Sequence, residues 1–449
     1  MALPYTITGA RDAKWLPAAT PLYFTPEQPY SVLVWVDEQG IAHARDGATG
    51  KIIAESSDHA AVIQAAIDSL PPFPAGEVLL KRGMYDIKRT IKILRSGFTL
   101  RGEGRGTLLV LADGASCDML QVGDGTNYYR EVTVADLELT GNKANNAAGS
   151  GIVVNGVGRT VIERCYVNNF KQHGILLTGT PARHTKFSVI RDNRIYSNDG
   201  HGVYALKYSY NDHIVNNDIA WNASGVRLEG VGETLVLGNS IWGNSVFGIE
   251  VYACYGLRIA ANMVLDSGND NIRIGASNRI LVIGNWTSYG SRSSTGIFDE
   301  IRLVAGSTAT TSDVLVLGNY CDPGSYAAFA IREDGAGAFQ NNLIAFNRVK
   351  PGTAGTIYAK AAMVVGNEGH RWVGQTVSVN ADASLAIPAG LWYASLAPNT
   401  LAEVYNPQTA AWETAIAAGG KGFIASDGSN ARLRNTGTAT ENSYLIRAL

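Results

Sequence analysis

The 449-residue chain has little charge, few cysteines and no long hydrophobic run. Charged residues make up 17% of it, against about 25% in a typical soluble domain. The 37 basic and 39 acidic residues leave a net charge of -2, which gives no bulk attraction to nucleic acid or to an anionic membrane. No stretch approaches the ~20 apolar residues of a membrane span, and no signal peptide is visible in MALPYTITGARDAKW. We therefore expect a soluble protein with neither nucleic acid nor a membrane as a partner.

The cysteines indicate neither a disulfide framework nor a metal site. Cys117, Cys165, Cys254 and Cys321 lie far apart in apolar segments, with no C-x-x-C pair and no histidine at metal-ligand spacing. We expect them to be structural thiols. No acidic cluster has the spacing of an EF-hand loop, so we predict no cofactor and no metal, with calcium left open.

The middle of the chain contains an internal repeat built around asparagine. The pattern apolar-x-x-Asn-x-apolar recurs at intervals of 20 to 34 residues, at Asn193, Asn217, Asn239, Asn262, Asn285, Asn319, Asn347 and Asn367. A small residue and a second apolar alternation follow, and no helical period separates them. One unit is too short to close a core, but coils of short strands stacked ~4.8 Å apart bury one face of every strand. The repeat predicts an all-β chain, a parallel β-helix.

The recurrent asparagine is predicted to be structural. Asparagine tolerates the left-handed backbone conformation at a corner and can form a hydrogen bond with the asparagine one coil away. A second asparagine follows five residues later at Asn198, Asn222 and Asn244. We interpret both series as ladders, not as glycosylation or catalytic sites.

Both flanks predict further units. Asp58 can begin a helix over residues 58–70 that covers the first coil. YSVLVWV and IAHAR, joined by DEQG, predict a hairpin before it. Short alternating segments replace the repeat near residue 373. We predict a hairpin or adaptor segment at 1–57, a parallel β-helix with its capping helix at 58–372, and a small C-terminal β-sandwich at 373–449.

The run from Asp58 through QAAI, GMY, SGFTL and GEG to Thr107 resembles the opening of the pectate-lyase superfamily. Together with the asparagine ladder, this resemblance covers about residues 58–370 and implies a right-handed parallel β-helix. The superfamily includes lyases, galacturonan hydrolases, mannuronan epimerases and phage tailspikes. The flanks GIAHARDGATGKIIA and ASDGSNARLRN are similar in style to those of phage tail proteins. That likeness implies a homotrimer and an extracellular or virion-surface location.

Two enzyme motifs of the superfamily match only in fragments. His201-Gly202 lies in a coil that resembles one of the mannuronan epimerases, but residues 173–178 read HGILLT where those enzymes carry YGFDPH. His201-Gly202 and Arg273-Ile274 match parts of the galacturonan hydrolase pattern, whose two aspartate motifs are absent. The resemblance therefore implies neither an epimerase nor a close relative of those hydrolases.

The period-two alternation predicts two columns of outward side chains on consecutive coils. The first column is Val153, Leu176, Tyr204, Arg227, Glu250, Arg273, Arg302, Arg332 and Tyr358. The second column is Asn155, Thr178, Leu206, Glu229, Tyr252, Gly275, Val304, Asp334 and Lys360. Neighbours within a column should lie about 5 Å apart, so the charged and aromatic members form one patch. Acidic side chains of the patch could neutralise its arginines in a solvated ladder. We favour instead the binding of an acidic polysaccharide, because guanidinium groups match carboxylates and tyrosines stack on sugar rings.

The patch suggests three functions. In β-elimination from a uronate, an arginine neutralises the carboxylate while other groups exchange protons. We predict this lyase chemistry, as in a tailspike-like depolymerase, with Arg227, Glu250, Tyr252 and Arg273 as catalytic residues. The predicted substrate-binding residues are His201, Tyr204, Glu229, Arg302, Arg332 and Asp334. An inverting hydrolase would use paired carboxylates, either Glu229 with Glu250 or Asp270 with Asp299. A non-catalytic adhesin is the third alternative.

Overall fold

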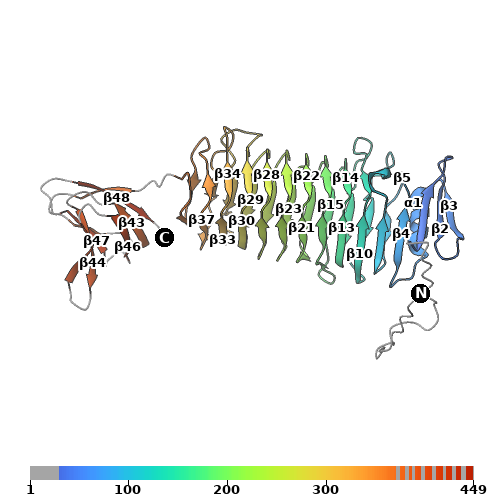
Figure 1. Ribbon diagram of the computed structural model, residues 1–449, viewed down its shortest axis with the longest axis horizontal. Coiled ribbons are helices and arrows are strands. Elements are labelled where there is room, and N and C mark those ends of the chain that lie inside the picture. Colours follow the sequence, from blue (N-terminus) through green and yellow to red (C-terminus); the bar gives the residue numbers. More distant parts are fainter. Residues whose placement is uncertain are drawn as a thin grey trace, which may run out of the picture.

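In the computed structural model, the described residues are 30–370 and the strands that follow them between residues 375 and 447 (Figure 1). Residues 1–29 of the predicted N-terminal segment lie outside the described residues. The described part consists mainly of stacked coils, and each coil contributes short strands to three parallel sheets, here called A, B and C. Sheets B and C contain 11 strands each, close to the predicted number of about ten coils.

The strand bounds follow the repeat. Sheet C, which carries the predicted patch, consists of β6 (Ile91–Ile93), β9 (Leu120–Val122), β12 (Ile152–Asn155), β15 (Ile175–Thr178), β19 (Val203–Leu206), β23 (Val226–Glu229), β26 (Ile249–Tyr252), β29 (Ile272–Gly275), β32 (Ile301–Val304), β35 (Ile331–Asp334) and β39 (Ile357–Tyr358). Sheet B consists of β5 (Gly83–Ile87), β8 (Thr107–Leu111), β11 (Glu138–Thr140), β14 (Tyr166–Asn168), β18 (Arg194–Tyr196), β22 (Asp218–Ala220), β25 (Ser240–Trp242), β28 (Met263–Leu265), β31 (Trp286–Ser288), β34 (Tyr320–Asp322) and β38 (Arg348–Val349). Within the coils, sheet A consists of β4 (Gly76–Leu80), β7 (Phe98–Arg101), β10 (Tyr129–Ala135), β13 (Val157–Glu163), β16 (Thr185–Lys186), β17 (Val189–Arg191), β20 (Ser209–Tyr210), β21 (His213–Val215), β24 (Leu235–Leu237), β27 (Arg258–Ala260), β30 (Asn278–Ile283), β33 (Thr311–Leu317), β36 (Phe339–Gln340), β37 (Leu343–Ala345) and β40 (Met363–Val365).

The asparagine ladder lies inside the coils and is confirmed as structural. The backbone N–H and the side-chain amide of Asn193 both donate to Oδ1 of Asn217, each at 3.0 Å. The same pattern continues to the last coil, where the N–H of Asn347 donates to Oδ1 of Asn367 at 2.9 Å. The ladder satisfies polar groups that would otherwise be buried without partners at every corner.

The left-handed corner residue is not the ladder asparagine, contrary to the prediction. It is the residue immediately before it, as at Asp192 (φ 56°) and Ala261 (φ 51°). Glycine takes this place at Gly238, where φ is 66°. The ladder asparagine keeps an ordinary backbone because its side chain must point inward, toward the next coil, while the residue before it turns outward at the corner.

The N-terminal end is covered as predicted. Strands β1 (Val32–Val36) and β2 (Ala42–Asp46) form the antiparallel hairpin, β3 (Ile52–Ser56) joins β2, and β1 pairs in parallel with β4 of sheet A. Helix α1 (His59–Asp68) follows, with the Asp58 carboxylate accepting a hydrogen bond from the N–H of Ala61 at 3.1 Å. Its buried face, which includes Val62 and Ile63, packs against these strands and the first coil. The domain boundary at 57 and 58 stays a prediction.

Beyond the coils, the described strands form two four-stranded antiparallel sheets. They are β41 (Gln375–Val379), β42 (Ser384–Ala386), β43 (Gly390–Ser395), β44 (Thr400–Asn406), β45 (Ala411–Ile416), β46 (Lys421–Ser426), β47 (Ala431–Asn435) and β48 (Glu441–Arg447). Two antiparallel sheets are the two layers expected of the small C-terminal β-sandwich. None of the helices in the described part of the chain is long and apolar enough to cross a membrane.

Candidate active-site face on sheet C

The strand register of sheet C brings the predicted columns together. Arg227 lies opposite Glu250, Glu250 opposite Arg273, and Arg273 opposite Arg302 on consecutive strands. In the second column Glu229 lies opposite Tyr252. Both columns face away from the core because the residues between them, such as Leu228 and Val251, are fully or almost fully buried. Lys360 lies outside its column, since β39 ends at Tyr358.

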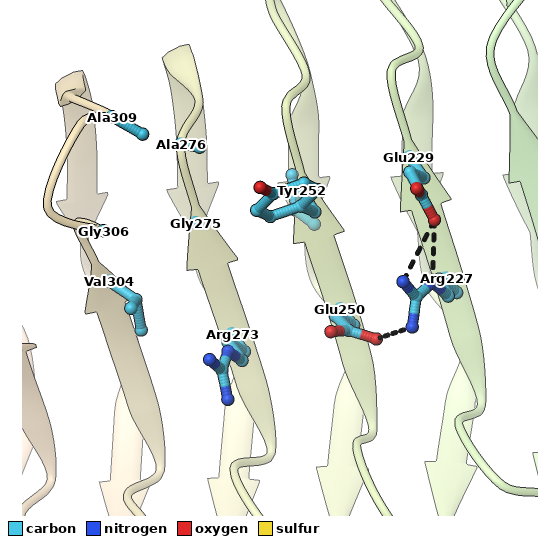
Figure 2. A pocket seen from close by; sticks show the side chains of 11 residues that line it. Arg227, Glu229, Glu250, Tyr252, Arg273, Gly275, Ala276, Val304, Gly306 and Ala309 are labelled. Carbon is cyan, nitrogen blue, oxygen red and sulfur yellow. Dashed lines mark hydrogen bonds and ion pairs between the residues drawn. The ribbon is translucent and has the colours of Figure 1, made fainter. Parts of the chain in front are cut away.

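A cavity of about 370 Å³ opens on this face where the four predicted catalytic residues meet. Figure 2 shows the side chains of Arg227, Glu250, Tyr252 and Arg273 around it. The rest of the lining is Glu229, Val251, Gly275, Ala276, Val304, Gly306 and Ala309. The small side chains on the strands after Tyr252 leave the space into which a ligand group can enter.

Arg227 joins two carboxylates at one side of the cavity. Its Nη1 lies 2.9 Å from Oε2 of Glu250, and its Nη2 lies 3.0 Å from Oε2 of Glu229 (Figure 2). The Tyr204 hydroxyl donates to the same Glu229 oxygen at 2.6 Å. This network fixes three charged side chains in front of sheet C, and its arginine is already neutralised.

The two carboxyl groups of this network have pKa values displaced in opposite directions. The hydrogen bond from Tyr204 lowers the pKa of Glu229, with help from Arg227. Burial raises the pKa of Glu250, although Arg227 opposes the rise. Burial and the Glu229 contact raise the pKa of Tyr204 to about 12. Opposite displacements are the usual sign of an acid and a base in one site.

Arg273 differs from the other arginines of the column. The nearest carboxylate oxygen, Oδ2 of Asp270, is 4.0 Å from its Nη1, and its guanidinium lies 5.1 Å from the ring centroid of Phe247. Arg227, Arg302 and Arg332 each donate to a carboxylate, whereas within the described residues no hydrogen bond from Arg273 is found. Its side chain is 32% exposed. Arg273 is thus the cation of the column that can bind an external anion.

Asp270 and Asp299, the second carboxylate pair suggested by the sequence, lie behind the arginines without exposed surface. The N–H of Asp299 donates to Asp270 at 2.8 Å, and Asp299 accepts from Nε of Arg332 at 2.7 Å. Burial raises the pKa of Asp270 to about 6 and that of Asp299 to about 7. Because neither carboxyl can touch a polysaccharide in this arrangement, the pair does not fit the role of hydrolytic acid and base.

Arg302, Arg332 and Asp334 belong to the same ion network. Arg302 contacts the Asp334 carboxylate, and its Nε lies 3.4 Å from Asp299. The solvated-ladder interpretation therefore describes this end of the patch, since its arginines are neutralised by protein carboxylates. Their predicted role as substrate-binding residues stays a prediction.

His201 lies at the other end of the patch, stacked on His173 with ring centroids 5.2 Å apart. Tyr204 meets both rings edge-on at 5.0 Å. Burial lowers the pKa of His173 to about 4 and that of His201 to about 3, so both rings are neutral near pH 7. The predicted set does not include His173, although the repeated His-Gly pairs at 173–174 and 201–202 place two imidazoles on consecutive coils.

The described residues contain no group of three or more His, Cys, Asp or Glu side chains that could hold a metal ion. All four cysteines are free thiols, as expected, and Cys165, Cys254 and Cys321 are buried. Burial raises the pKa of Cys254 to about 11, which keeps the thiol protonated and unreactive.

Comparison with known proteins supports the fold. Residues 116–219 and 150–298 match the family model described as the right-handed beta helix region. The A-module of the Azotobacter vinelandii mannuronan C-5 epimerase AlgE6 is 18% identical, with 70% of this chain and 95% of that chain covered and a TM-score of 0.58. The enzymatically active domain of bacteriophage CBA120 tailspike protein 2 is 12% identical, with coverage of 88% and 75% and a TM-score of 0.52. The Dettilon tailspike protein is 14% identical, with coverage of 86% and 89% and a TM-score of 0.51.

No curated protein sequence matches the chain. The family-model match, the three stacked parallel sheets and these structural likenesses agree on one architecture. The stacked coils of the described residues therefore form a right-handed parallel β-helix, a fold that this chain shares with the epimerase module and the tailspike proteins.

Proposed function

We propose that the sheet C face binds an acidic polysaccharide and cleaves it by β-elimination at a uronic acid residue. The observation that carries this proposal is Arg273, whose guanidinium lines the cavity without a carboxylate at hydrogen-bond distance. A guanidinium group can bind a uronate carboxylate through two parallel N–H···O hydrogen bonds, so the two groups match in charge and in geometry. The fold supports a polysaccharide-active protein, because similar structures include a mannuronan epimerase module and an enzymatically active tailspike domain.

The groups around the cavity can perform the elimination. Arg273 would bind the uronate carboxylate and stabilise the negative charge that develops as the proton on C5 leaves. Tyr252, in its ionised form, would accept that proton, while protonated Glu250 would donate a proton to the glycosidic oxygen on C4. The C4–O bond breaks as the C4=C5 double bond forms. Solvent then returns a proton to Glu250 and takes one from Tyr252, which restores the starting state.

A glycoside hydrolase is the second candidate, and the opposite pKa displacements of Glu229 and Glu250 favour it. Glu250 would be the general acid and Glu229 the base that activates water. One oxygen of each carboxylate, however, contacts the Arg227 guanidinium. The guanidinium therefore takes up part of the space that the attacking water of an inverting hydrolase would need between the two carboxylates.

A panel of acidic polysaccharides, including alginate, polygalacturonate and hyaluronan, separates these functions. A lyase forms unsaturated uronates, which absorb in the ultraviolet, whereas a hydrolase forms reducing ends without that absorbance. Exchange of the C5 proton with deuterated solvent without cleavage indicates an epimerase, and binding alone indicates an adhesin. We expect unsaturated products and their loss in Arg273→Ala, with the exposed sheet A residue Arg258 as the matched control in Arg258→Ala.

We further propose that the chain assembles as a homotrimer and acts outside the cell or on a virion surface. Support for assembly comes from an aliphatic face on the last coils of sheet A, where consecutive strands pair Leu281 with Leu315, Leu315 with Leu343, and Leu343 with Met363. An exposed aliphatic area spanning several coils is typical of a protein interface. Light scattering at the mass of a single chain would exclude the trimer.

A further inference from the structure

Sheet B carries a second surface, made of aromatic side chains instead of arginines. We call it the aromatic track and define it as Tyr166, Tyr196, Trp221, Trp242, Trp286 and Tyr320. These residues lie on β14, β18, β25, β31 and β34 or, for Trp221, at the corner just after β22. They follow the axis of the stacked coils in two neighbouring columns, with Tyr196 and Trp242 in one and Tyr166, Trp286 and Tyr320 in the other. Strand β28 (Met263–Leu265) lies between Trp242 and Trp286 and contributes aliphatic side chains to the track instead of aromatic ones. Trp221 and Trp286 expose 53% and 52% of their surface.

Trp221 occupies a position that disfavours a large side chain. Its φ is 56°, in the left-handed region, where the next coil has Gly243 at φ 61°. A Cβ atom on Gly243 would lie 3.0 Å from the Trp221 indole, so the indole lies directly over that glycine. The left-handed conformation itself belongs to the fold, since Ser197 and Asp266 adopt it at the same corner of other coils. Trp221 differs from them by placing a large, half-exposed indole on the surface at this corner, where it can contact a ligand.

The rings around Trp221 are held in place before any ligand arrives. The Asp218 carboxylate accepts from the Tyr196 hydroxyl and, at 3.0 Å, from the indole N–H of Trp242. The Trp221 and Trp242 rings meet edge to face with centroids 4.5 Å apart. Such fixed aromatic groups can bind a flat apolar surface with little loss of side-chain entropy.

Further along the track, an open hollow of about 380 Å³ is lined by Trp286, Tyr320 and the backbone beside them. Gly284 and Gly318 line it, and a Cβ atom on either glycine would meet no atom within 4 Å. The two rings lie at 90° to each other with centroids 5.9 Å apart. The exposed indole of Trp286 beside this open backbone leaves room for a sugar ring to stack on it.

Several charges beside the track are paired within the protein. Asp322 pairs with Lys350 at 2.6 Å, and Arg105 pairs with Glu138 at 3.0 Å. Arg194 lies opposite Asp218 on the neighbouring strand, and no ion pair of its exposed side chain is found within the described residues. The Arg105 guanidinium lies 4.3 Å over the Tyr166 ring, so the exposed aromatic faces of the track are mainly those of Trp221 and Trp286. These two indoles lie on a different sheet from the Arg273 cavity of sheet C.

From these observations we infer that the aromatic track is a second saccharide-binding surface, which stacks the uncharged faces of pyranose rings in a polysaccharide chain running along the coil axis. The inference takes only its general ligand class from the proposed function. It requires neither Arg273 nor cleavage, and it places binding of neutral sugar rings and binding of the uronate on different sheets.

Affinity electrophoresis in gels containing dextran, galactomannan or xyloglucan tests the inference. We expect at least one of these neutral polymers to retard the protein, and we expect Trp221→Ala with Trp286→Ala to weaken the interaction by about ten-fold or more. Tyr128→Ala is the matched control, because Tyr128 is 60% exposed but lies off the track. Trp286→Leu, which keeps an apolar side chain without an aromatic face, serves if the double variant unfolds.

Two outcomes would overturn the inference: no retardation by any of the three polymers, or equal retardation of the parent protein and the tryptophan variants. Failure of the proposed function has a different signature. Arg273→Ala should bind neutral polymers normally, and the tryptophan variants should keep any activity on short acidic oligosaccharides.

Discussion

Replacing Arg273 and Arg302 by alanine should have opposite consequences, although the two residues are neighbours in one column. Arg273 is one-third exposed, and its closest carboxylate oxygen lies 4.0 Å away. Its removal should cost under about 1 kcal/mol of stability, most of it from the contact with the Phe247 ring. If it binds a uronate through a charge-assisted fork, the same change should cost about 1.5 to 3 kcal/mol of binding, or about ten- to a hundred-fold in affinity.

Arg302 should show the reverse pattern. Its side chain is 13% exposed and lies within 3.6 Å of both Asp270 and Asp299. Alanine at this position leaves two buried carboxyls with less compensation, which costs roughly 3 kcal/mol when a buried ion pair is broken. Protonation of the carboxyls would absorb part of that cost, so the loss of stability should be larger at high pH.

Calorimetric titration with an acidic oligosaccharide and thermal unfolding, both applied to each variant, measure the two effects. We expect Arg273→Ala to lose affinity at nearly unchanged stability, and Arg302→Ala to unfold at a lower temperature. The reasoning is refuted if Arg273→Ala binds like the parent protein, or if the two variants lose equal stability.

Four further outcomes are expected. Activity should fall as pH rises through the raised pKa of Glu250, because the acid form is consumed, and Glu250→Gln should abolish cleavage while sparing binding. Asn239→Ala should lower the free energy of unfolding by about 2 to 4 kcal/mol, because the buried N–H of Asn217 loses its acceptor; urea unfolding measures it. Burial raises the pKa of Glu300 from 4.5 to about 8, so its proton is kept on folding and stability should decrease between these pH values; the decrease should be smaller in Glu300→Gln, as thermal unfolding at both ends of the range would show. Leu315→Asp should shift the light-scattering mass to that of a single chain if sheet A mediates assembly.

The repeat architecture and the orientation of the sheet C side chains are accessible from the sequence for one physical reason. The side-chain period of a strand is two, so a register slip of one residue would expose every Ile, Val and Leu of a coil. In GVYA, GVRL and GIEV the aliphatic residues must face the core, so the residues that alternate with them must face outward. Arg227 and Glu250 must then be neighbours in adjacent coils, as the strand pairing shows.

Which carboxylate pairs with which arginine of the column cannot be predicted from the sequence in this way. Three arginines follow one another in the column, and the sequence offers each of them several acidic neighbours. Arg302 and Arg332 are neutralised because Asp299, just before its strand, turns its carboxylate behind the column. Arg273 has only a long ion pair with Asp270, at 4.0 Å and without a hydrogen bond. The choice depends on side-chain rotamers and burial, neither of which follows from periodicity.

The cavity arises where the repeat departs most from its own regularity. The interval from Asn285 to Asn319 is 34 residues, whereas the preceding ones are 22 to 24. The additional chain in this coil contributes Gly306 and Ala309 to one wall, beyond the end of β32, while the regular strand β26 contributes Glu250 and Tyr252 to the other. Regular coils hold the reactive side chains at fixed spacing because their core permits only one register. The insertion is free to vary, since it lies outside that core, and it is the part of the coil that can adapt the cavity to a particular ligand.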